Sequence, residues 1–218
     1  AVTSGTNLLL GIDNDYVGGT LSSLTNTGSL SSNYAVYVAS SGNLGGLTNS
    51  GTLSGAGAAI HNEGILGAIV NSGVIAGNIE NLSAQALSIS GGTLTGYTAG
   101  TQGTITNLLG GVVLSGSMAL NDAINVGSNT VTNNGGTPSL SHVVNVTGNY
   151  SQTSGTLAIG SGAMLAVSGV ASITGGNDEA GKCGACKRLD GDIGLAEWLE
   201  VGLTMVSDAQ QELGHHGH

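Results

Sequence analysis

One seven-residue unit decides the fold, and it occurs three times between residues 47 and 75: 47–53 (LTNSGTL), 60–66 (IHNEGIL) and 69–75 (IVNSGVI). An earlier copy stands at 24–30 (LTNTGSL). In each copy an aliphatic residue is followed at two-residue steps by Asn, by Gly and by a second aliphatic residue. A recurring unit of this kind is typical of stacked repeat architectures.

The residue types of the unit predict its conformation. Two aliphatic side chains six positions apart point to the same face of an extended chain, because side chains alternate with a period of two. The Asn and Gly between them favour a turn, since Gly adopts positive φ without steric cost and Asn tolerates it. The unit therefore predicts two short strands around a corner, with one aliphatic side chain of each strand pointing inward.

Stacking of such units predicts a ladder of Asn side chains that hydrogen-bond from one rung to the next. The four candidates are Asn26, Asn49, Asn62 and Asn71. The intervals between them are 23, 13 and 9 residues, so consecutive units cannot all lie one rung apart. Some of these asparagines must occupy different corners of the same coil.

Composition and patterning predict an ordered, all-β region over residues 1–176. The chain has 40 Gly and 7% charged residues, but 39% of its residues are hydrophobic, which argues against disorder. No stretch of 1–176 has a convincing helical period, and short strands alternate with Gly, Ser and Asn turns. With roughly 20 residues per coil, we expect about eight rungs.

Charge divides the chain into two parts and limits its partners. Residues 1–176 contain five acidic residues and no Lys or Arg, and the net charge of the whole chain is −10. A surface without cations cannot neutralise phosphates, so we expect no nucleic-acid binding. The sequence offers no run of apolar residues long enough for a transmembrane helix, and we expect no membrane span.

Residues 177–218 form a second segment of different character, which is charged and carries the Cys residues. Asp192 is a candidate cap for a helix over about 193–213, and such a helix would be a suitable polar cap for the last rung. Gly194 and Gly202 weaken this helix.

The two cysteines are separated by two residues, which is the spacing of a metal knuckle or a redox pair. Cys183 and Cys186 would need two further ligands to bind zinc, and His215, His216 and His218 are the candidates. No second Cys pair is present, and the βαβ context of a thioredoxin motif is missing. A local disulfide or two free thiols is the alternative interpretation, and we expect no metal or cofactor.

The histidines and carboxylates of 1–176 predict no catalytic site. His61 and His142 each lie next to a turn without a nucleophile motif, and we expect them to be structural. Five acidic residues over about eight rungs argue against the paired carboxylates of sugar hydrolysis, although Glu63 and Glu80 could fall on neighbouring rungs. We therefore expect no enzyme.

Residues 41–176 resemble the passenger region of bacterial autotransporters, the secreted part of type V secretion proteins. The resemblance is carried by 48–53 (TNSGTL), 85–97 (QALSISGGTLTGY), 120–127 (LNDAINVG) and 147–152 (TGNYSQ). It implies a right-handed parallel β-helix, displayed on or released from a Gram-negative cell. The outer-membrane barrel of that family is not found in these residues, and 177–218 match nothing in the passenger; they are a cap, a fusion or a frameshifted end.

The resulting functional expectation is a non-enzymatic extracellular passenger that mediates adhesion, self-association or biofilm formation. Its expected partners are further copies of itself, a host-surface protein or a glycan. The alternatives are a passive spacer that holds another domain away from the cell, and a polysaccharide-processing β-helix.

Overall fold

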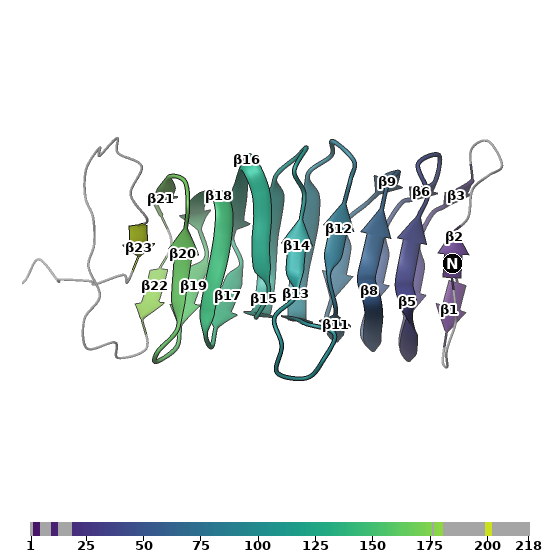
Figure 1. Ribbon diagram of the computed structural model, residues 1–218, viewed down its shortest axis with the longest axis horizontal. Helices are drawn as coiled ribbons and strands as arrows, with labels where there is room; N and C mark the ends of the chain where they lie inside the picture. The colour runs from purple at the N-terminus through teal and green to yellow at the C-terminus, as the bar shows by residue number, and fades with distance from the viewer. Residues whose placement is uncertain (1, 5–9, 13–18, 176, 181–198, 202–218) are drawn as a thin grey trace, which may run out of the picture.

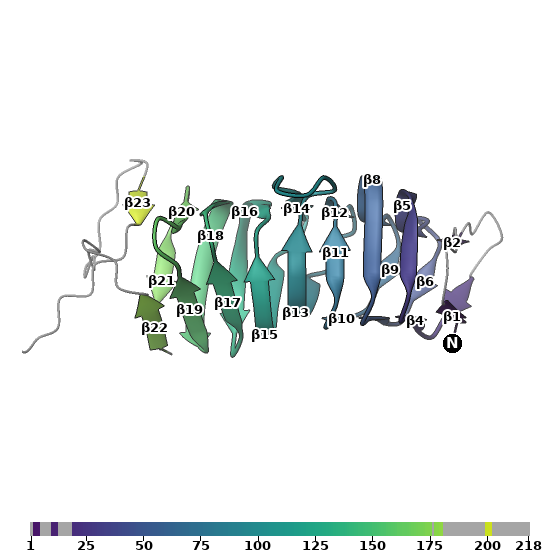
Figure 2. The same ribbon diagram turned by 90° about the horizontal axis from the view of Figure 1, so that it is seen from below.

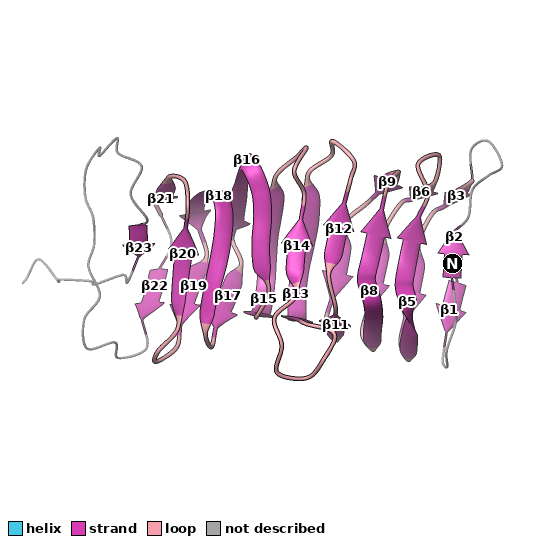
Figure 3. Cartoon of the chain, viewed as in Figure 1, coloured by secondary structure: helices cyan, strands magenta, loops and turns pink. Residues whose placement is uncertain are grey.

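The computed structural model describes residues 2–4, 10–12, 19–175, 177–180 and 199–201. These residues form a parallel β-solenoid of about seven turns, and none of them is helical. Figure 1 and Figure 2 show strands lying side by side along one long axis in both views, and Figure 3 shows only strands and loops among the described residues. The all-β parallel β-helix prediction is confirmed. About eight rungs of roughly 20 residues were expected; the observed rungs vary in length, from 22 and 23 residues between the first aligned asparagines to 19 between Asn133 and Gln152.

Each full turn of the chain contributes to three faces. Face 1 contains β1 (Val2–Ser4), β4 (Leu24–Asn26), β7 (Leu47–Asn49), β10 (Ile69–Asn71) and β21 (Ala171–Ile173). Face 2 contains β11 (Val74–Ala76), β17 (Thr137–Leu140), β19 (Thr156–Ile159) and β22 (Asn177–Ala180). Face 3 contains β2 (Leu10–Ile12), β12 (Ile79–Asn81), β14 (Thr104–Thr106) and β20 (Met164–Val167).

Longer strands pass around the corners and belong to two faces each. They are β5 (Ser29–Val38) and β8 (Thr52–Asn62) on faces 2 and 3, β13 (Leu87–Thr95) and β15 (Val112–Leu120) on faces 1 and 2, and β16 (Ala123–Asn134) and β18 (Val143–Ser154) on faces 3 and 1. A short sheet of β3 (Thr20–Leu21), β6 (Asn43–Leu44) and β9 (Ile65–Leu66) lies between faces 3 and 1.

The core is a set of aliphatic columns that run along the solenoid axis. On face 1, Leu24 aligns with Leu47, Leu47 with Ile69, Ile69 with Ile89, and Ile89 with Leu114. All five side chains are buried. Burial of one such side chain contributes about 1.5–3 kcal/mol, so the columns supply the main favourable free energy of the fold.

Three successive rungs are joined by buried asparagine amides inside the first corner, which lies between faces 1 and 2. The Nδ2 of Asn26 donates to the Oδ1 of Asn49, and the Nδ2 of Asn49 donates to the Oδ1 of Asn71, both at 2.8 Å. The ladder then ends, because Gly91 occupies the next position, and Asn71 donates to its carbonyl at 3.4 Å. The side-chain amides of the three asparagines are therefore paired with one another and with nearby backbone groups.

Asn62 belongs to a second ladder on a different corner. It ends the face 3 part of β8, and its Nδ2 donates to the Oδ1 of Asn81 on the next rung. Asn81 and Asn107 then both donate to the carbonyl of Gln85, at 3.0 Å each. The four asparagines predicted from the sequence are thus divided between two corners, and Asn81 was not among them.

The first corner also requires residues without a side chain. A Cβ on Gly51 would lie 1.9 Å from the carbonyl oxygen of Gly28, and a Cβ on Gly73 would lie 2.0 Å from that of Gly51. Such distances are impossible for real atoms, so the backbone of one rung approaches the next too closely for any other residue. This explains the Gly two positions after Asn in the repeated unit.

One loop leaves the solenoid between β13 and β14, over residues 96–103, and is visible as a protrusion in Figure 1. It is closed by backbone hydrogen bonds from Gly96 to Thr101 and from Thr101 to Thr98. Tyr97 lies in this loop and is 50% exposed.

The helix expected over 193–213 lies outside the described residues except at β23 (Leu199–Val201). These three residues form a strand that pairs antiparallel with β20, so the helix prediction is wrong there. The physical reason is that β20 offers unpaired backbone groups at its edge, which an extended segment satisfies and a helix does not.

We predict that Asn49→Ala destabilises the solenoid by about 3 kcal/mol. Asn49 is fully buried, and its removal takes one hydrogen-bond partner from the Nδ2 of Asn26 and one from the Oδ1 of Asn71. Urea unfolding followed by circular dichroism measures the effect. Asn145→Ala is the control, because Asn145 is exposed on β18 and its replacement should change stability by less than about 0.5 kcal/mol. Equal unfolding midpoints for the two variants would contradict a stabilising ladder.

Candidate functional site

His61, at the C-terminal end of β8, lies between two carboxylates. Its Nδ1 is 2.6 Å from the Oε2 of Glu80 on β12, and its Nε2 is 3.2 Å from the Oε1 of Glu63 in the turn after β8. The His61 side chain is 13% exposed, whereas those of Glu63 and Glu80 are 36% and 33% exposed. The imidazole is thus covered and the carboxylates face outward.

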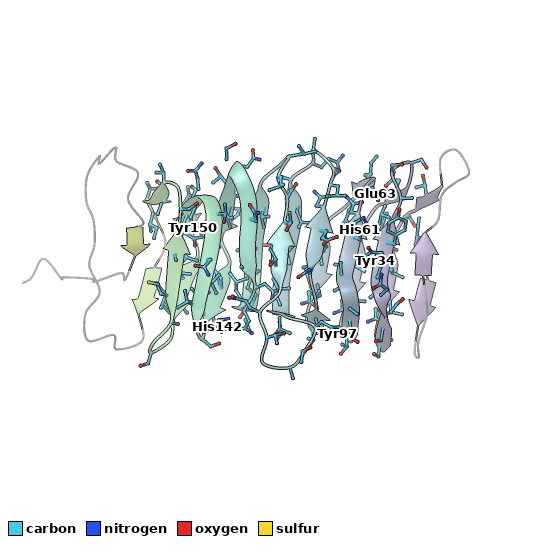
Figure 4. All side chains as sticks on the ribbon, in the orientation of Figure 1. Tyr34, His61, Glu63, Tyr97, His142 and Tyr150 are labelled. Carbon is cyan, nitrogen blue, oxygen red and sulfur yellow. The ribbon has the colours of Figure 1, made fainter. Side chains whose placement is uncertain are left out.

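Two tyrosine rings pack against the same imidazole. The ring centroid of Tyr37 is 5.4 Å from that of His61 with an interplanar angle of 18°, and that of Tyr34 is 4.9 Å away at 36°. The two tyrosine centroids are 6.0 Å apart. We call these five residues the ring-and-carboxylate patch: Tyr34, Tyr37, His61, Glu63 and Glu80. Figure 4 places Tyr34, His61 and Glu63 together on the N-terminal part of the rod.

The register of face 3 brings these residues together. Tyr37 pairs with His61 on the next rung, and His61 pairs with Glu80 on the rung after that, so the three form one outward column. Tyr34 is placed beside them because Gly57 leaves room. A Cβ on Gly57 would lie 3.1 Å from the Cε1 of Tyr34 and 2.9 Å from the Oδ1 of Asn33.

The patch is anionic whatever the protonation of His61. An imidazole carries at most one positive charge, and two ionised carboxylates carry two negative charges. Residues 1–176 contain no Lys or Arg that could offset them. Glu63 and Glu80 are also the only exposed carboxylates within residues 19–175, so this stretch has a single charged patch.

No family model, curated protein or solved structure matches this chain. The site is therefore interpreted from its own geometry.

The structure places the sequence-predicted residues as follows. Glu63 and Glu80 do come together, but through His61, which was expected to have only a structural role. Tyr34 and Tyr37 were not predicted; the signal that could have found them is their distance of about one rung from His61. The candidate zinc ligands Cys183, Cys186, His215 and His216 lie outside the described residues. Among the residues that are described, no group of three metal-ligating side chains could hold a metal ion.

A second polar cluster surrounds Asp122, the buried acidic residue in the turn before β16. Its Oδ1 accepts a hydrogen bond from the backbone N–H of Gly103 at 2.8 Å, and its Oδ2 is buried without a partner among the described residues. Burial raises the pKa of Asp122 to about 6, against smaller lowering effects of the Gly103 hydrogen bond and the charge of His142.

The residues around Asp122 include a serine and a histidine, but they do not form a catalytic triad. The hydroxyl of Ser141 donates to the Oδ1 of Asn121 at 3.0 Å, and the Nε2 of His142 is 3.0 Å from the carbonyl oxygen of Asn121. In a triad the carboxylate holds the imidazole and the imidazole accepts the serine proton. Here the Oγ of Ser141 does lie 3.2 Å from the Nδ1 of His142, but the other ring nitrogen faces the backbone carbonyl of Asn121 and the Asp122 carboxylate accepts from Gly103, so no carboxylate is hydrogen-bonded to the imidazole.

Within the described residues no helix is long and apolar enough to cross a membrane.

We predict that the solenoid becomes more stable as the pH falls from 7 to 4.5. The folded-state pKa of Asp122, about 6, lies above the unfolded value of about 3.9, so the folded state binds the proton more tightly. The contribution of Asp122 to the free energy of unfolding is fully present below its pKa in the unfolded state, and it is lost as the pH rises through its pKa in the folded state. The free energy of unfolding should increase by about 2 kcal/mol from pH 7 to pH 4.5.

Urea unfolding at both pH values measures the effect, and Asp122→Asn isolates it from the other carboxyl groups. The variant should lose this part of the pH dependence. An unchanged difference between pH 7 and pH 4.5 would show that Asp122 is not responsible.

Proposed function

We propose that this chain is a non-enzymatic extracellular rod of a bacterial cell surface, either displayed or secreted, that mediates adhesion, self-association or biofilm formation. The sequence resemblance to autotransporter passengers and the parallel solenoid of about seven turns support this proposal. A stiff stack of rungs suits presentation of a binding surface at a distance, because each rung is fixed by its neighbours.

The observation that carries the proposal is the ring-and-carboxylate patch. Tyrosine is enriched at binding hot spots because it buries a large ring at low entropy cost, and Tyr34 remains 37% exposed. A purely passive rod has no need for a cluster of rings and carboxylates at its surface.

The charge of the rod restricts its partners. A face with two exposed carboxylates and no cations repels nucleic acids and anionic surfaces. The proposed partners are a second copy of the chain, a host-surface protein or a glycan.

Two other functions are weaker candidates. A passive spacer would bind nothing, and it would leave the patch without a role beyond stacking. A polysaccharide-processing enzyme would need a carboxyl acid and a base or nucleophile free to act, whereas one oxygen of both Glu63 and Glu80 is held by His61.

We predict that Tyr34→Ala reduces partner binding by about ten-fold or more without unfolding the chain. Tyr34 is exposed and its ring supplies contact area, so truncation removes binding free energy rather than core packing. The measurement is light scattering for self-association, together with surface capture of matrix proteins and a glycan panel, with the whole 218-residue chain.

Tyr97→Ala is the matched control, because it also removes an exposed tyrosine but from the 96–103 loop. It should leave binding unchanged. If the unmodified chain binds neither itself nor any partner, the spacer is the better interpretation; if it shortens a polysaccharide, the chain is an enzyme.

A further inference from the structure

We propose that Asn134 and Gly135 form a self-modification site, at which the asparagine loses its amide as ammonia and becomes aspartate or isoaspartate. This inference is independent of the proposed binding function, because it concerns a reaction of the chain with water alone.

The first argument is the position of this pair in the sequence and in the fold. It is the one place in the 218 residues where Asn is followed directly by Gly. Asn134 is the last residue of β16, and both residues are exposed. Gly135 has a φ of 73° and no side chain, so nothing of its own hinders the approach of its backbone nitrogen to the side chain of Asn134.

The second argument is that the two reacting groups are free. Within the described part of the chain, neither the side-chain amide of Asn134 nor the backbone N–H of Gly135 makes a hydrogen bond. Both groups are therefore available to each other without the loss of an existing contact.

The asparagines of the first ladder show the opposite arrangement. The Nδ2 of Asn49 donates to Asn71, and the backbone N–H groups that follow these two asparagines are also occupied. The N–H of Ser50 donates to the carbonyl of Asn26 at 2.9 Å, and the N–H of Ser72 donates to the carbonyl of Asn49 at 2.8 Å. A ladder asparagine therefore reacts only after local opening of its corner.

The reaction balances with water as the sole co-reactant. The backbone nitrogen of Gly135 attacks the Cγ of Asn134, so that the N–Cγ bond forms and the Cγ–Nδ2 bond breaks. Ammonia leaves with the proton of the glycine N–H, and a cyclic imide remains. Water then opens this ring at either of its carbonyl carbons, which produces aspartate or isoaspartate.

The isoaspartate product lengthens the backbone at a corner that has no spare room. The chain then runs through the Cβ and Cγ of residue 134 and is longer by one carbon atom. Gly136 lies so close to the next rung that a Cβ on Gly155 would be 2.3 Å from its carbonyl oxygen. Gly136 also donates to the Oδ1 of Asn133 and accepts from the N–H of Thr156. We expect isoaspartate to displace these contacts and to loosen the connection between β16 and β17.

The test follows the folded, full-length chain during incubation in mildly alkaline buffer, where the glycine N–H loses its proton more easily. Digestion must use a protease other than trypsin, because residues 1–176 contain no Lys or Arg. Fragmentation mass spectrometry then measures acid formation at each asparagine, and an ammonia assay measures the leaving group. We expect Asn134 to react about ten-fold or more faster than the ladder asparagines, which need local opening.

Asn134→Gln tests the site, because glutamine keeps an exposed amide but has one more methylene group and closes the ring far more slowly. This variant should release less ammonia and keep residue 134 unmodified. Asn145→Gln is the matched control, since Asn145 is also exposed but is followed by Val146, and it should leave the reaction of Asn134 unchanged.

The structural consequence is measured on the isoaspartate form after its separation by ion-exchange chromatography. Its urea unfolding midpoint should be lower than that of the unmodified chain. Asn134→Asp is the control, because it adds the charge without lengthening the backbone, and its midpoint should remain close to that of the unmodified chain.

The outcomes are distinct. If Asn134 keeps its amide while the urea-unfolded chain loses it, or if the ladder asparagines react as fast in the folded chain, the site is overturned. If the isoaspartate form unfolds at the same urea concentration as the unmodified chain, the loosening of the corner is overturned. Neither result bears on partner binding, which Tyr34→Ala tests separately.

Discussion

The structure depends on one constraint: each rung must place the same kind of residue directly above the corresponding residue of the rung below. Parallel pairing makes this possible, because it aligns equivalent positions rather than opposing ones. Where the aligned residue is aliphatic, the result is a core column such as Leu24, Leu47 and Ile69. Where it is Asn, the buried amides satisfy one another, which is necessary because an unpaired buried amide is costly. A shift of one residue would break both columns at once.

The same alignment acts on the outer surface, where it brings ionisable and aromatic side chains next to one another. Tyr37, His61 and Glu80 occupy one outward column for the same reason that Asn26, Asn49 and Asn71 occupy one inward column. Inside the coil, alignment of identical amides creates a self-satisfied structural element. On the outside, alignment of different residues gathers ionisable and aromatic side chains in one patch. The rest of residues 19–175 has few charged or aromatic side chains. The surface patch is therefore a product of the repeat.

The fold was predictable because its signal is local. Asn followed by Gly at a fixed step, with aliphatic residues at both ends, is sufficient to predict a corner between two strands. The patch was less predictable because its signal is not local. Tyr37 and His61 are 24 residues apart, but His61 and Glu80 only 19, so no single period connects them. The rungs differ in length because loops and bulges absorb the variation, as between Ser32 and Tyr34. Asn62 lies on a different corner from Asn49 because the two are separated by 13 residues, which is less than one rung of 22 or 23.

The 96–103 loop shows where this architecture can accept new sequence. It leaves the rod after β13 and returns before β14, and it is closed at its base by its own backbone hydrogen bonds. Gln102 and Gly103, at the end of the loop, hydrogen-bond to Val143 and Asp122 on other rungs, but the two asparagine ladders do not pass through the loop. Exposed loops of this kind tolerate the insertion of whole domains. The tip of this loop is therefore a suitable site at which another domain could be inserted and held at a fixed position along the solenoid axis.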